Sequence, residues 1–409
     1  MLLKIGLVVI GVVVLYVGVQ VLLYKRDMKK TKEDLLTFVA KNKKDVSVTI
    51  IENDDVVLEW NADQKTPLAS TEKLVVLFHF VKAVSIGGIK LEEKVALSNI
   101  ERFYIDRTDG GAHAYWLEVN DFSEHAALLD VAKGMMQFSS NACTDYLIDR
   151  LGLEKINDQM KQAGLTEHDE LMPLTPVILW SAYVSDRRRD AFKKMSGVSE
   201  EQYKSLMNEI FNIMKNDPEH KKALEEKMKK KNLLGWRIQS LLTQKLTKST
   251  TNQYAQFMKR LHDELLTTEE KSLFSQIVLG ETLKKETDQY FWYKGGATLF
   301  VFTGALYRRT DTSSISIALF INDSKANNSH WIGEVFNEFM LTAAVDQNFR
   351  QRLIQAFTNN HQKKQRETSL CFIVSPWETF CIHLGVSRLT SQLHQLVPFA
   401  KGLYRLCTF

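Results

Sequence analysis

Three short polar motifs in a fixed order constrain what this chain of 409 residues can fold into. Ser-Thr-Glu-Lys at residues 70–73 begins an apolar helical pattern, and Ser-Ser-Asn at 139–141 begins another helical run. Lys-Gly-Gly at 294–296 stands at the head of a β-rich stretch. Ser139 follows Ser70 by 69 residues, and Lys294 follows Ser139 by 155. Each motif is common by itself, but the ordered set indicates one site in a mixed α and β fold.

Ser70 and Lys73 are spaced for nucleophilic catalysis. Residues three apart on a helix lie on one face, so the Lys73 ammonium is expected one turn from Ser70. A serine hydroxyl attacks well only when a neighbour takes its proton, and a desolvated lysine near another cation has a lowered pKa that suits it to this role. The helix N-terminus also favours developing negative charge. The plain alternative is a capping serine with a lysine nearby.

The other two motifs supply groups for proton relay and substrate binding. The hydroxyl of Ser139 can pass a proton to a leaving group, and the amide of Asn141 can bond a substrate carbonyl. Lys294 can attract a carboxylate, and two glycines let a substrate lie against a strand without a Cβ in the way. In isolation these motifs would be an N-cap serine pair and a turn before a strand.

The ordered set resembles that of the serine β-lactamase and penicillin-binding-protein superfamily, and most closely that of the class A β-lactamases. The resemblance covers roughly residues 35–358 and implies an α+β, β-lactamase-like fold: an antiparallel sheet flanked by helices, plus an all-helical subdomain. Early strands near 46–60 and late strands near 298–322 would join in one sheet. The long second separation fits a helical insertion.

The resemblance also implies roles for the catalytic residues. Ser70 would be the acylated nucleophile, and Lys73 would assist in its deprotonation. Ser139 would shuttle a proton to the lactam or peptide nitrogen. Class A enzymes carry a water-activating glutamate on a loop after the S-x-N helix, and here Glu167 and Glu170 fall in that stretch without a clear register. We favour Glu170, with Glu167 as the alternative.

The substrate-binding residues follow in the same way. Asn141 would hold a substrate amide and the Lys73 ammonium, and Lys294 would draw the substrate carboxylate. The backbone N–H groups of Ser70 and Ala297 would form the oxyanion hole. The family usually has a hydroxyl residue where this chain has Gly295, so one substrate hydrogen bond would be lost, while Gly296 keeps the strand narrow.

Periodicity outlines the rest of the chain. Residues 46–51 and 56–60 are strand-like around a turn, and 126–163 contain two or three helices. Residues 185–285 alternate charge blocks with apolar helical turns, which predicts a solvent-facing helical insertion; a nucleic-acid or membrane patch is the alternative. Two late strands form a hairpin around 310–312, and 330–358 form an amphipathic helix. The tail, residues 359–409, matches no pattern, so the hydrolase domain is predicted at 33–358.

The N-terminal end predicts a membrane anchor. Residues 5–24 carry no charge and are long enough to span a bilayer as a helix. Residues 1–32 would thus be an anchor with a basic juxtamembrane segment, on a single-pass protein whose catalytic domain faces outward. The positive-inside rule opposes that orientation, because one lysine precedes the span and five basic residues follow it: Lys25, Arg26, Lys29, Lys30 and Lys32.

Composition excludes several other classes. With 53 basic and 49 acidic residues, the net charge of +4 is too small for a dedicated nucleic-acid binder. The 4 cysteines form no CxxC pair, and the histidines lack ligand spacing, so no metal and no cofactor are expected. We interpret His79 as a core residue, His113 as a loop group and Cys143 as a small buried residue.

The sequence therefore predicts a serine hydrolase that forms an acyl-enzyme at Ser70 with β-lactams and hydrolyses them. Two alternatives remain open. One is a D,D-peptidase or penicillin-binding protein that acts on D-Ala-D-Ala peptides of peptidoglycan and deacylates slowly. The other is a non-catalytic cell-wall binding module that uses the 185–285 insertion as its contact surface.

Overall fold

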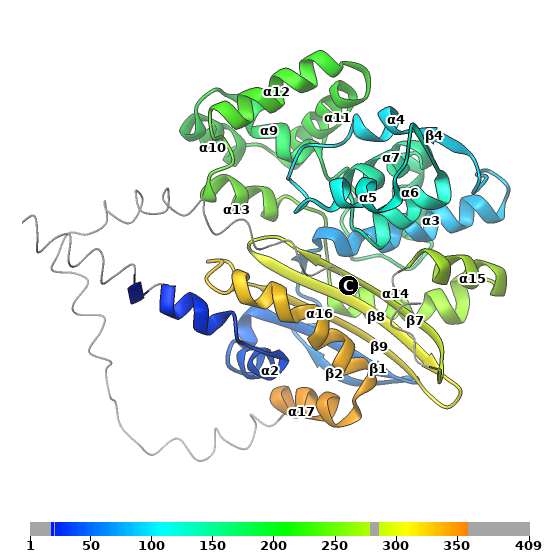
Figure 1. The fold of residues 1–409 in the computed structure, drawn as a ribbon. Helices are drawn as coiled ribbons and strands as arrows, with labels where there is room; N and C mark the ends of the chain where they lie inside the picture. Colours follow the sequence, from blue (N-terminus) through cyan, green and yellow to red (C-terminus); the bar gives the residue numbers. More distant parts are fainter. Residues whose placement is uncertain (1–17, 20, 279–285, 359–409) are drawn as a thin grey trace, which may run out of the picture. The chain divides into compact units, whose positions relative to one another are not determined.

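A five-stranded antiparallel sheet forms the centre of the fold (Figure 1). The computed structural model describes residues 18–19, 21–278 and 286–358. The strand order is β2-β1-β9-β8-β7. The strands are β1 (Val46–Glu52), β2 (Asp55–Trp60), β7 (Asp288–Ala297), β8 (Val301–Thr310) and β9 (Ser314–Asn322). Residues 1–354 form one unit; of a second, 355–409, the structure describes the last residues of α17 (Gln347–Thr358).

The sheet joins the two ends of the domain, as the resemblance implied. β1 pairs with the early β2 on one side and the late β9 on the other, with Ile50 opposite Ile317. Both predicted hairpins are confirmed. The prediction of two late strands was wrong, because the chain forms three: Lys294 lies near the end of β7 and not at the head of a hairpin. The glycines after Lys294 hid this strand, since glycine usually marks a turn.

Helices cover both faces of the sheet (Figure 1). On one face α16 (Ser329–Val345) packs against β8 and β9 and is joined by α2 (Lys32–Lys41). The single helix predicted for 330–358 is two helices, because Asp346 leaves the helical conformation and its carboxylate accepts the N–H of Phe349 at 3.0 Å, capping α17. On the other face α14 (Thr251–Arg260) packs against β1, β8 and β9.

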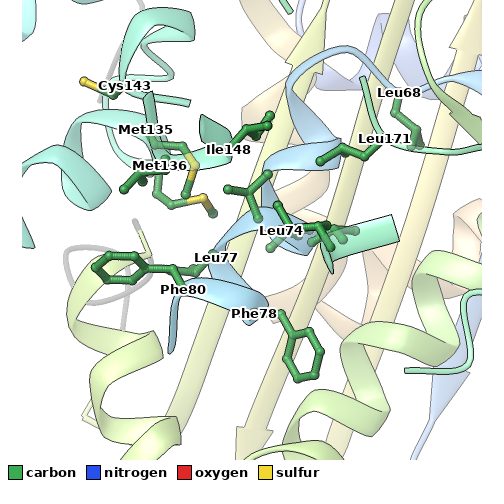
Figure 2. Close-up of a cluster of buried hydrophobic side chains, with 14 of the residues drawn as sticks. Leu68, Leu74, Leu77, Phe78, Phe80, Met135, Met136, Cys143, Ile148 and Leu171 are labelled. Atoms are coloured by element: carbon green, nitrogen blue, oxygen red, sulfur yellow. The ribbon is translucent and has the colours of Figure 1, made fainter. Parts of the chain in front are cut away.

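The all-helical part is built around α3 (Lys73–Ser85), which is apolar on nearly all sides and is buried accordingly. Figure 2 shows Leu74, Leu77 and Phe80 of α3 against Met135 and Met136. The surrounding elements are β4 (Lys94–Ala96), α4 (Leu97–Glu101), α5 (Ala112–Asn120), β5 (His125–Ala127), α6 (Leu128–Met136), α7 (Asn141–Leu151), α8 (Leu153–Met160) and α15 (Thr268–Ile277).

The region predicted as one insertion divides into two parts. The first surrounds α9 (Pro176–Val184) and contains α10 (Arg188–Ser196), α11 (Glu200–Asn216), α12 (Pro218–Lys230) and α13 (Trp236–Gln244). The solvent-facing prediction was wrong for α14, whose apolar residues lie on the sheet. The second part contains α14 and α15. Short β6 (Lys248–Ser249), which pairs with β3 (Thr66–Pro67), lies between the two parts in sequence. Residues 279–285 lie outside the described residues.

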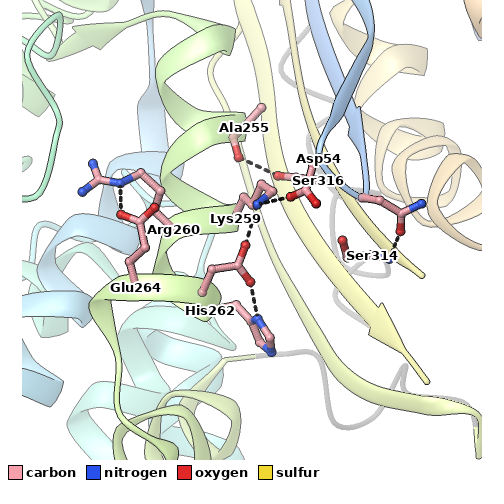
Figure 3. A network of polar contacts seen from close by, with 10 residues as sticks. Asp54, Ala255, Lys259, Arg260, His262, Glu264, Ser314 and Ser316 are labelled. Atoms are coloured by element: carbon pink, nitrogen blue, oxygen red, sulfur yellow. Dashed lines mark hydrogen bonds and ion pairs between the residues drawn. The ribbon is translucent and has the colours of Figure 1, made fainter. Parts of the chain in front are cut away.

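Polar contacts fix α14 to the sheet (Figure 3). The Ser316 hydroxyl of β9 donates to the Ala255 carbonyl at 2.7 Å. Lys259 pairs with Asp54 of the early hairpin at 3.0 Å and with Asp263 at 2.6 Å. Asp263 belongs to a single π-helical turn, Leu261–Leu265, that ends α14. These contacts hold α14 in place against the strands that it covers.

The N-terminal segment leads into the sheet face that carries α16. Residues 18–19 and 21–27 are helical, and Tyr24 stacks on His330 of α16 with ring centroids 5.6 Å apart. No helix among residues 18–19, 21–278 and 286–358 has the length and hydropathy that a bilayer crossing requires. Most of the predicted anchor, residues 5–17 and 20, and the tail 359–409 lie outside the described residues.

Candidate active site

Ser70 lies in a strained turn that precedes α3. The turn is a 3₁₀ helix, Ala69–Glu72, and Ala69 has a φ of +47°, in the left-handed region that residues with a Cβ rarely adopt. β8 braces this turn: the Thr303 hydroxyl donates to the Leu68 carbonyl at 2.6 Å and lies 2.8 Å from the Thr71 hydroxyl. The brace holds Ser70 at a fixed place beside the sheet.

Gly296 brings β7 against the backbone of the nucleophile. A Cβ at this position would lie 2.7 Å from the Ser70 nitrogen and 2.7 Å from the Leu68 carbonyl oxygen. Side chains essentially never approach backbone atoms so closely, so only glycine fits without moving the strand. The second glycine of the motif thus sets the distance between Ser70 and the strand.

β7 is the edge strand of the sheet, and its outer edge faces the site. In the turn after β7, the N–H of Thr298 donates to the Val301 carbonyl of β8 at 2.9 Å. Because backbone groups alternate along a strand, those of Gly295 and Ala297 point to the open edge. Lys294 Nζ donates to the Gly295 carbonyl at 2.9 Å on that edge. The Ala297 N–H therefore points to the open edge of β7, and its role in an oxyanion hole stays a prediction.

Lys73 joins the first two motifs. Its ammonium donates to the Ser139 carbonyl at 2.6 Å and to Asn141 Oδ1 at 2.9 Å, and Ser139 Oγ lies 3.4 Å away. Burial lowers the pKa of Lys73 to about 8, while nearby acidic groups, Asp109 first, oppose that shift. A lysine with this pKa can lose its proton near neutral pH, as a general base must.

Lys294 joins the third motif to the second. Its Nζ lies 3.0 Å from Ser139 Oγ, so the ammonium groups of Lys73 and Lys294 both point at that hydroxyl. Burial, and then the charge of Lys73, lower the pKa of Lys294 well below its usual range. Since Ser139 Oγ accepts from both cations, its own hydrogen remains available for a third group, such as a leaving nitrogen.

His113 was predicted to be a loop group, and this was wrong. It lies in the first turn of α5, fully buried, with Nδ1 2.9 Å from Ser140 Oγ. Ser140 caps α7 by accepting the Cys143 N–H at 3.1 Å, while its neighbour Ser139 has a φ of +67°. Burial lowers the pKa of His113 to about 4. A neutral His113 therefore supports the strained Ser139 turn, and no sequence spacing signals this contact.

His79 and Cys143 are both buried, as the sequence predicted. His79 of α3 is buried, and burial lowers its pKa to about 4. Cys143 is fully buried, and burial raises the pKa of its thiol to about 12. The thiol is thus a packing group.

The structure explains why position 295 is a glycine, which the sequence did not indicate. A Cβ there would lie 2.8 Å from the Tyr293 hydroxyl and 3.0 Å from Asn337 Oδ1. Tyr293 donates to Asn337 at 2.6 Å, so a tyrosine of the same strand and an asparagine of α16 fill the space beside the glycine. A hydroxyl residue at position 295 would meet this pair.

Neither Glu167 nor Glu170 contacts a residue of the three motifs in the part of the chain that the structure describes. Both side chains are exposed, and Glu170 pairs with Lys204 of α11 at 2.7 Å.

Sequence reasoning missed Asp145 of α7, a carboxylate that binds the loop after α8. It is fully buried and accepts the N–H groups of Leu174 and Thr175, each at 2.8 Å. The loop after α8 is therefore fastened to α7 at Thr175.

Glu72 is the second buried carboxyl that sequence reasoning missed. It is 1% exposed, and neither oxygen has a hydrogen bond of good geometry. Burial raises its pKa to about 8, while the Thr247 hydroxyl and Lys73 oppose the shift. Glu72 is therefore largely protonated at neutral pH and adds no full negative charge beside Lys73.

Known proteins resemble the chain in sequence and in fold. A sequence model described as the Beta-lactamase enzyme family matches residues 30–291. No curated protein matches significantly. A PBP-A mutant, solved as an acyl-enzyme complex with penicillin G, is 15% identical over 82% of this chain and 96% of its own, with a TM-score of 0.43. A class A β-lactamase from Bacteroides cellulosilyticus is 14% identical over 81% of this chain and 100% of its own, with a TM-score of 0.46.

The family model spans more than half of the chain, and it includes the first two motifs and the beginning of β7, the strand that carries the third. The match therefore shows the family, and the contacts of Lys73 with Ser139 and Asn141 agree with it. The chain belongs to the β-lactamase enzyme family, within the superfamily of serine β-lactamases and penicillin-binding proteins.

Proposed function

We propose that this protein is a serine acyl-transfer enzyme that β-lactams acylate at Ser70. One observation carries the proposal: the ammonium groups of Lys73 and Lys294 meet at the Ser139 hydroxyl, at 3.4 and 3.0 Å, beside the nucleophile turn. Two buried cations on one hydroxyl are costly to assemble for structure alone. They suit a reaction that removes one proton, delivers another and binds an anionic substrate.

The acylation step follows from these positions. Neutral Lys73 takes the Ser70 proton as Oγ attacks the carbonyl carbon, and the N–H groups of Ser70 and Ala297 stabilise the oxyanion. The carbonyl carbon forms a bond to Oγ, and the lactam C–N bond breaks. Ser139 gives its proton to the departing nitrogen and is reprotonated from the lysines. Lys294 attracts the substrate carboxylate, and Asn141 bonds its side-chain amide.

We further propose that deacylation is slow. Hydrolysis of the ester needs a water that a nearby base activates. Glu170, the residue favoured for that role, is exposed and paired with Lys204. This observation favours a penicillin-binding or D,D-peptidase activity over an efficient β-lactamase. The natural acyl donor would then be a D-Ala-D-Ala stem peptide of peptidoglycan, lying as an added strand along β7.

We propose an extracytoplasmic position at the cell membrane. The uncharged run at residues 5–24 and the exposed apolar side chains of Val19, Leu22 and Leu23 support it. A membrane-impermeant fluorescent penicillin tests it: the full chain should be labelled in intact cells. Labelling only after lysis would overturn the position while leaving the acylation proposal intact.

The test of the activity is a time course of intact-mass spectra of the full chain with penicillin G. We expect an adduct of one penicillin that persists for hours and is absent in Ser70→Ala. A transient adduct with consumption of the drug would instead identify a β-lactamase. Absence of both, with the chain folded and bound to peptidoglycan, would support the non-catalytic wall-binding module.

A further inference from the structure

Helix α13, which precedes β6, contacts the substrate-binding strand just beyond the site. The Thr243 hydroxyl of α13 lies 3.1 Å from the Thr298 hydroxyl. Thr298 directly follows Ala297, whose N–H points to the open edge of β7. The helix therefore lies along the turn that continues β7 (Figure 1).

Trp236, the first residue of α13, extends this contact. Its ring packs on Phe300 in the same turn, with centroids 4.9 Å apart at 67°. Phe300 is buried, whereas Trp236 is 50% exposed. An exposed tryptophan on a buried aromatic presents a rigid apolar face to solvent, and such faces commonly mark binding surfaces.

A second exposed aromatic has the same relation to the site. Tyr115 of α5 is 44% exposed and packs on Phe138, the neighbour of Ser139, with centroids 5.7 Å apart. Among the large hydrophobic residues that are exposed in the described chain, Tyr115 and Trp236 are the aromatic ones outside the N-terminal helical segment. Each packs on an aromatic residue that is close in sequence to a motif, Trp236 on Phe300 and Tyr115 on Phe138.

The direction of a bound substrate relates Trp236 to the reaction. With its carboxylate at Lys294 and its reacting carbonyl at Ala297, a substrate runs along β7 toward Thr298. At about 3.3 Å per residue, the acyl side chain beyond the carbonyl reaches the turn that α13 covers. At that turn, the exposed Trp236 packs on Phe300.

We propose that Trp236 determines substrate specificity by contacting the acyl side chain, and that the preferred acyl donors carry an apolar or aromatic group there. This inference rests on the proposed acylation of Ser70. Trp236 would affect recognition of the acyl group and not the chemical step, because its described contacts include no bond to Ser70, Lys73 or Ser139.

The test compares two β-lactams on the full chain: penicillin G, which carries a phenylacetyl side chain, and 6-aminopenicillanic acid, which carries none. Second-order acylation rate constants are measured by intact mass. We expect Trp236→Ala to slow acylation by penicillin G about tenfold and to leave 6-aminopenicillanic acid within about twofold. Trp236→Phe should recover most of the rate, and Arg237→Ala, at an exposed neighbour on α13, should match the wild type.

Each result decides a separate point. Equal loss with both β-lactams in Trp236→Ala would mean that Trp236 only supports the turn, and would overturn the inference. Unchanged acylation rates with both β-lactams in Trp236→Ala would overturn it too. Absence of an adduct in the wild type with either compound would overturn the proposed function, and this inference with it. Thermal unfolding of each variant checks that the chain is folded.

Discussion

Lys294 Nζ lies 3.0 Å from Ser139 Oγ, although the two residues are 155 positions apart in sequence and come from a strand and from the turn before a helix. The contact joins the third motif to the second. After burial, the nearby charge of Lys73 further lowers the pKa of Lys294.

The first prediction concerns the pH dependence of acylation. Lys73 has a lowered pKa of about 8, so its neutral, basic form grows as pH rises toward that value. We expect the acylation rate at saturating penicillin G to increase about tenfold per pH unit well below pH 8 and to level off above it. Saturation is needed because a bound carboxylate offsets the low pKa of Lys294. Stopped mass spectra between pH 5.5 and 9.5 measure the profile, and a flat profile would exclude Lys73 as the base.

Gly296→Ala tests the close approach of β7 to the nucleophile. The added Cβ would lie 2.7 Å from the Ser70 nitrogen, so the strand must move and the oxyanion hole opens. We expect acylation to slow on the order of 10²–10³-fold, and the free energy of unfolding to fall by about 1–3 kcal/mol. Gly197→Ala is the matched control, because its Cβ would meet atoms only at 3.9 Å.

Gly295→Thr tests whether the missing hydroxyl of the third motif can be restored. By itself the threonine should destabilise the chain, because its Cβ would lie 2.8 Å from the Tyr293 hydroxyl. Tyr293→Phe removes that oxygen, so the double variant should recover part of the lost unfolding temperature. Additive losses of stability in the double variant, measured by thermal unfolding, would show that the Tyr293 hydroxyl is not the obstacle.

Glu170→Gln tests the residue that the sequence favoured as the water-activating base. Since Glu170 pairs with Lys204 in solvent, we expect the half-life of the penicillin adduct to change less than about twofold, and stability by less than about 1 kcal/mol. Lys204→Met, which breaks the same ion pair, should behave alike. A much longer adduct lifetime in the glutamine variant alone would restore Glu170 as the base.

Glu72→Gln should stabilise the fold increasingly as pH rises. The folded chain holds the Glu72 proton up to about pH 8, whereas the unfolded chain releases it near its ordinary pKa of 4.5. In the wild type this group therefore costs stability progressively between those values, reaching about 4 kcal/mol at pH 8. Urea unfolding at pH 5 and pH 8 measures the difference between variant and wild type, and a difference independent of pH would contradict a buried, protonated Glu72.

Local sequence patterns predicted the helices that carry the motifs because capping and apolar periodicity are local properties. Ser140 at the start of α7 and the apolar run of α3 are examples. The resemblance predicted that Asn141 holds the Lys73 ammonium, and the two side chains are 2.9 Å apart. The catalytic roles of Ser70, Lys73 and Ser139 stay predictions. The early and late hairpins were readable from alternation around polar turns.

Features that depend on tertiary contacts could not be predicted. Strand β7 was missed because Gly295 and Gly296 are selected by atoms of α16 and of the Ser70 turn, which are distant in sequence. The contact of His113 with Ser140 and the burial of Glu72 arise only when helices assemble. Charge density suggested that all of 185–285 faces solvent, yet the apolar side of α14 packs on the sheet.

The helices α9 to α13 leave and rejoin the catalytic frame at two fastened points. They leave at Thr175, which Asp145 holds, and they rejoin at β6, where Lys248 pairs with Pro67 just before the nucleophile turn. The helical segment is therefore attached to the rest of the domain at its two ends. The length or composition of this segment could change between the two points while the Ser70 turn and β7 keep their places.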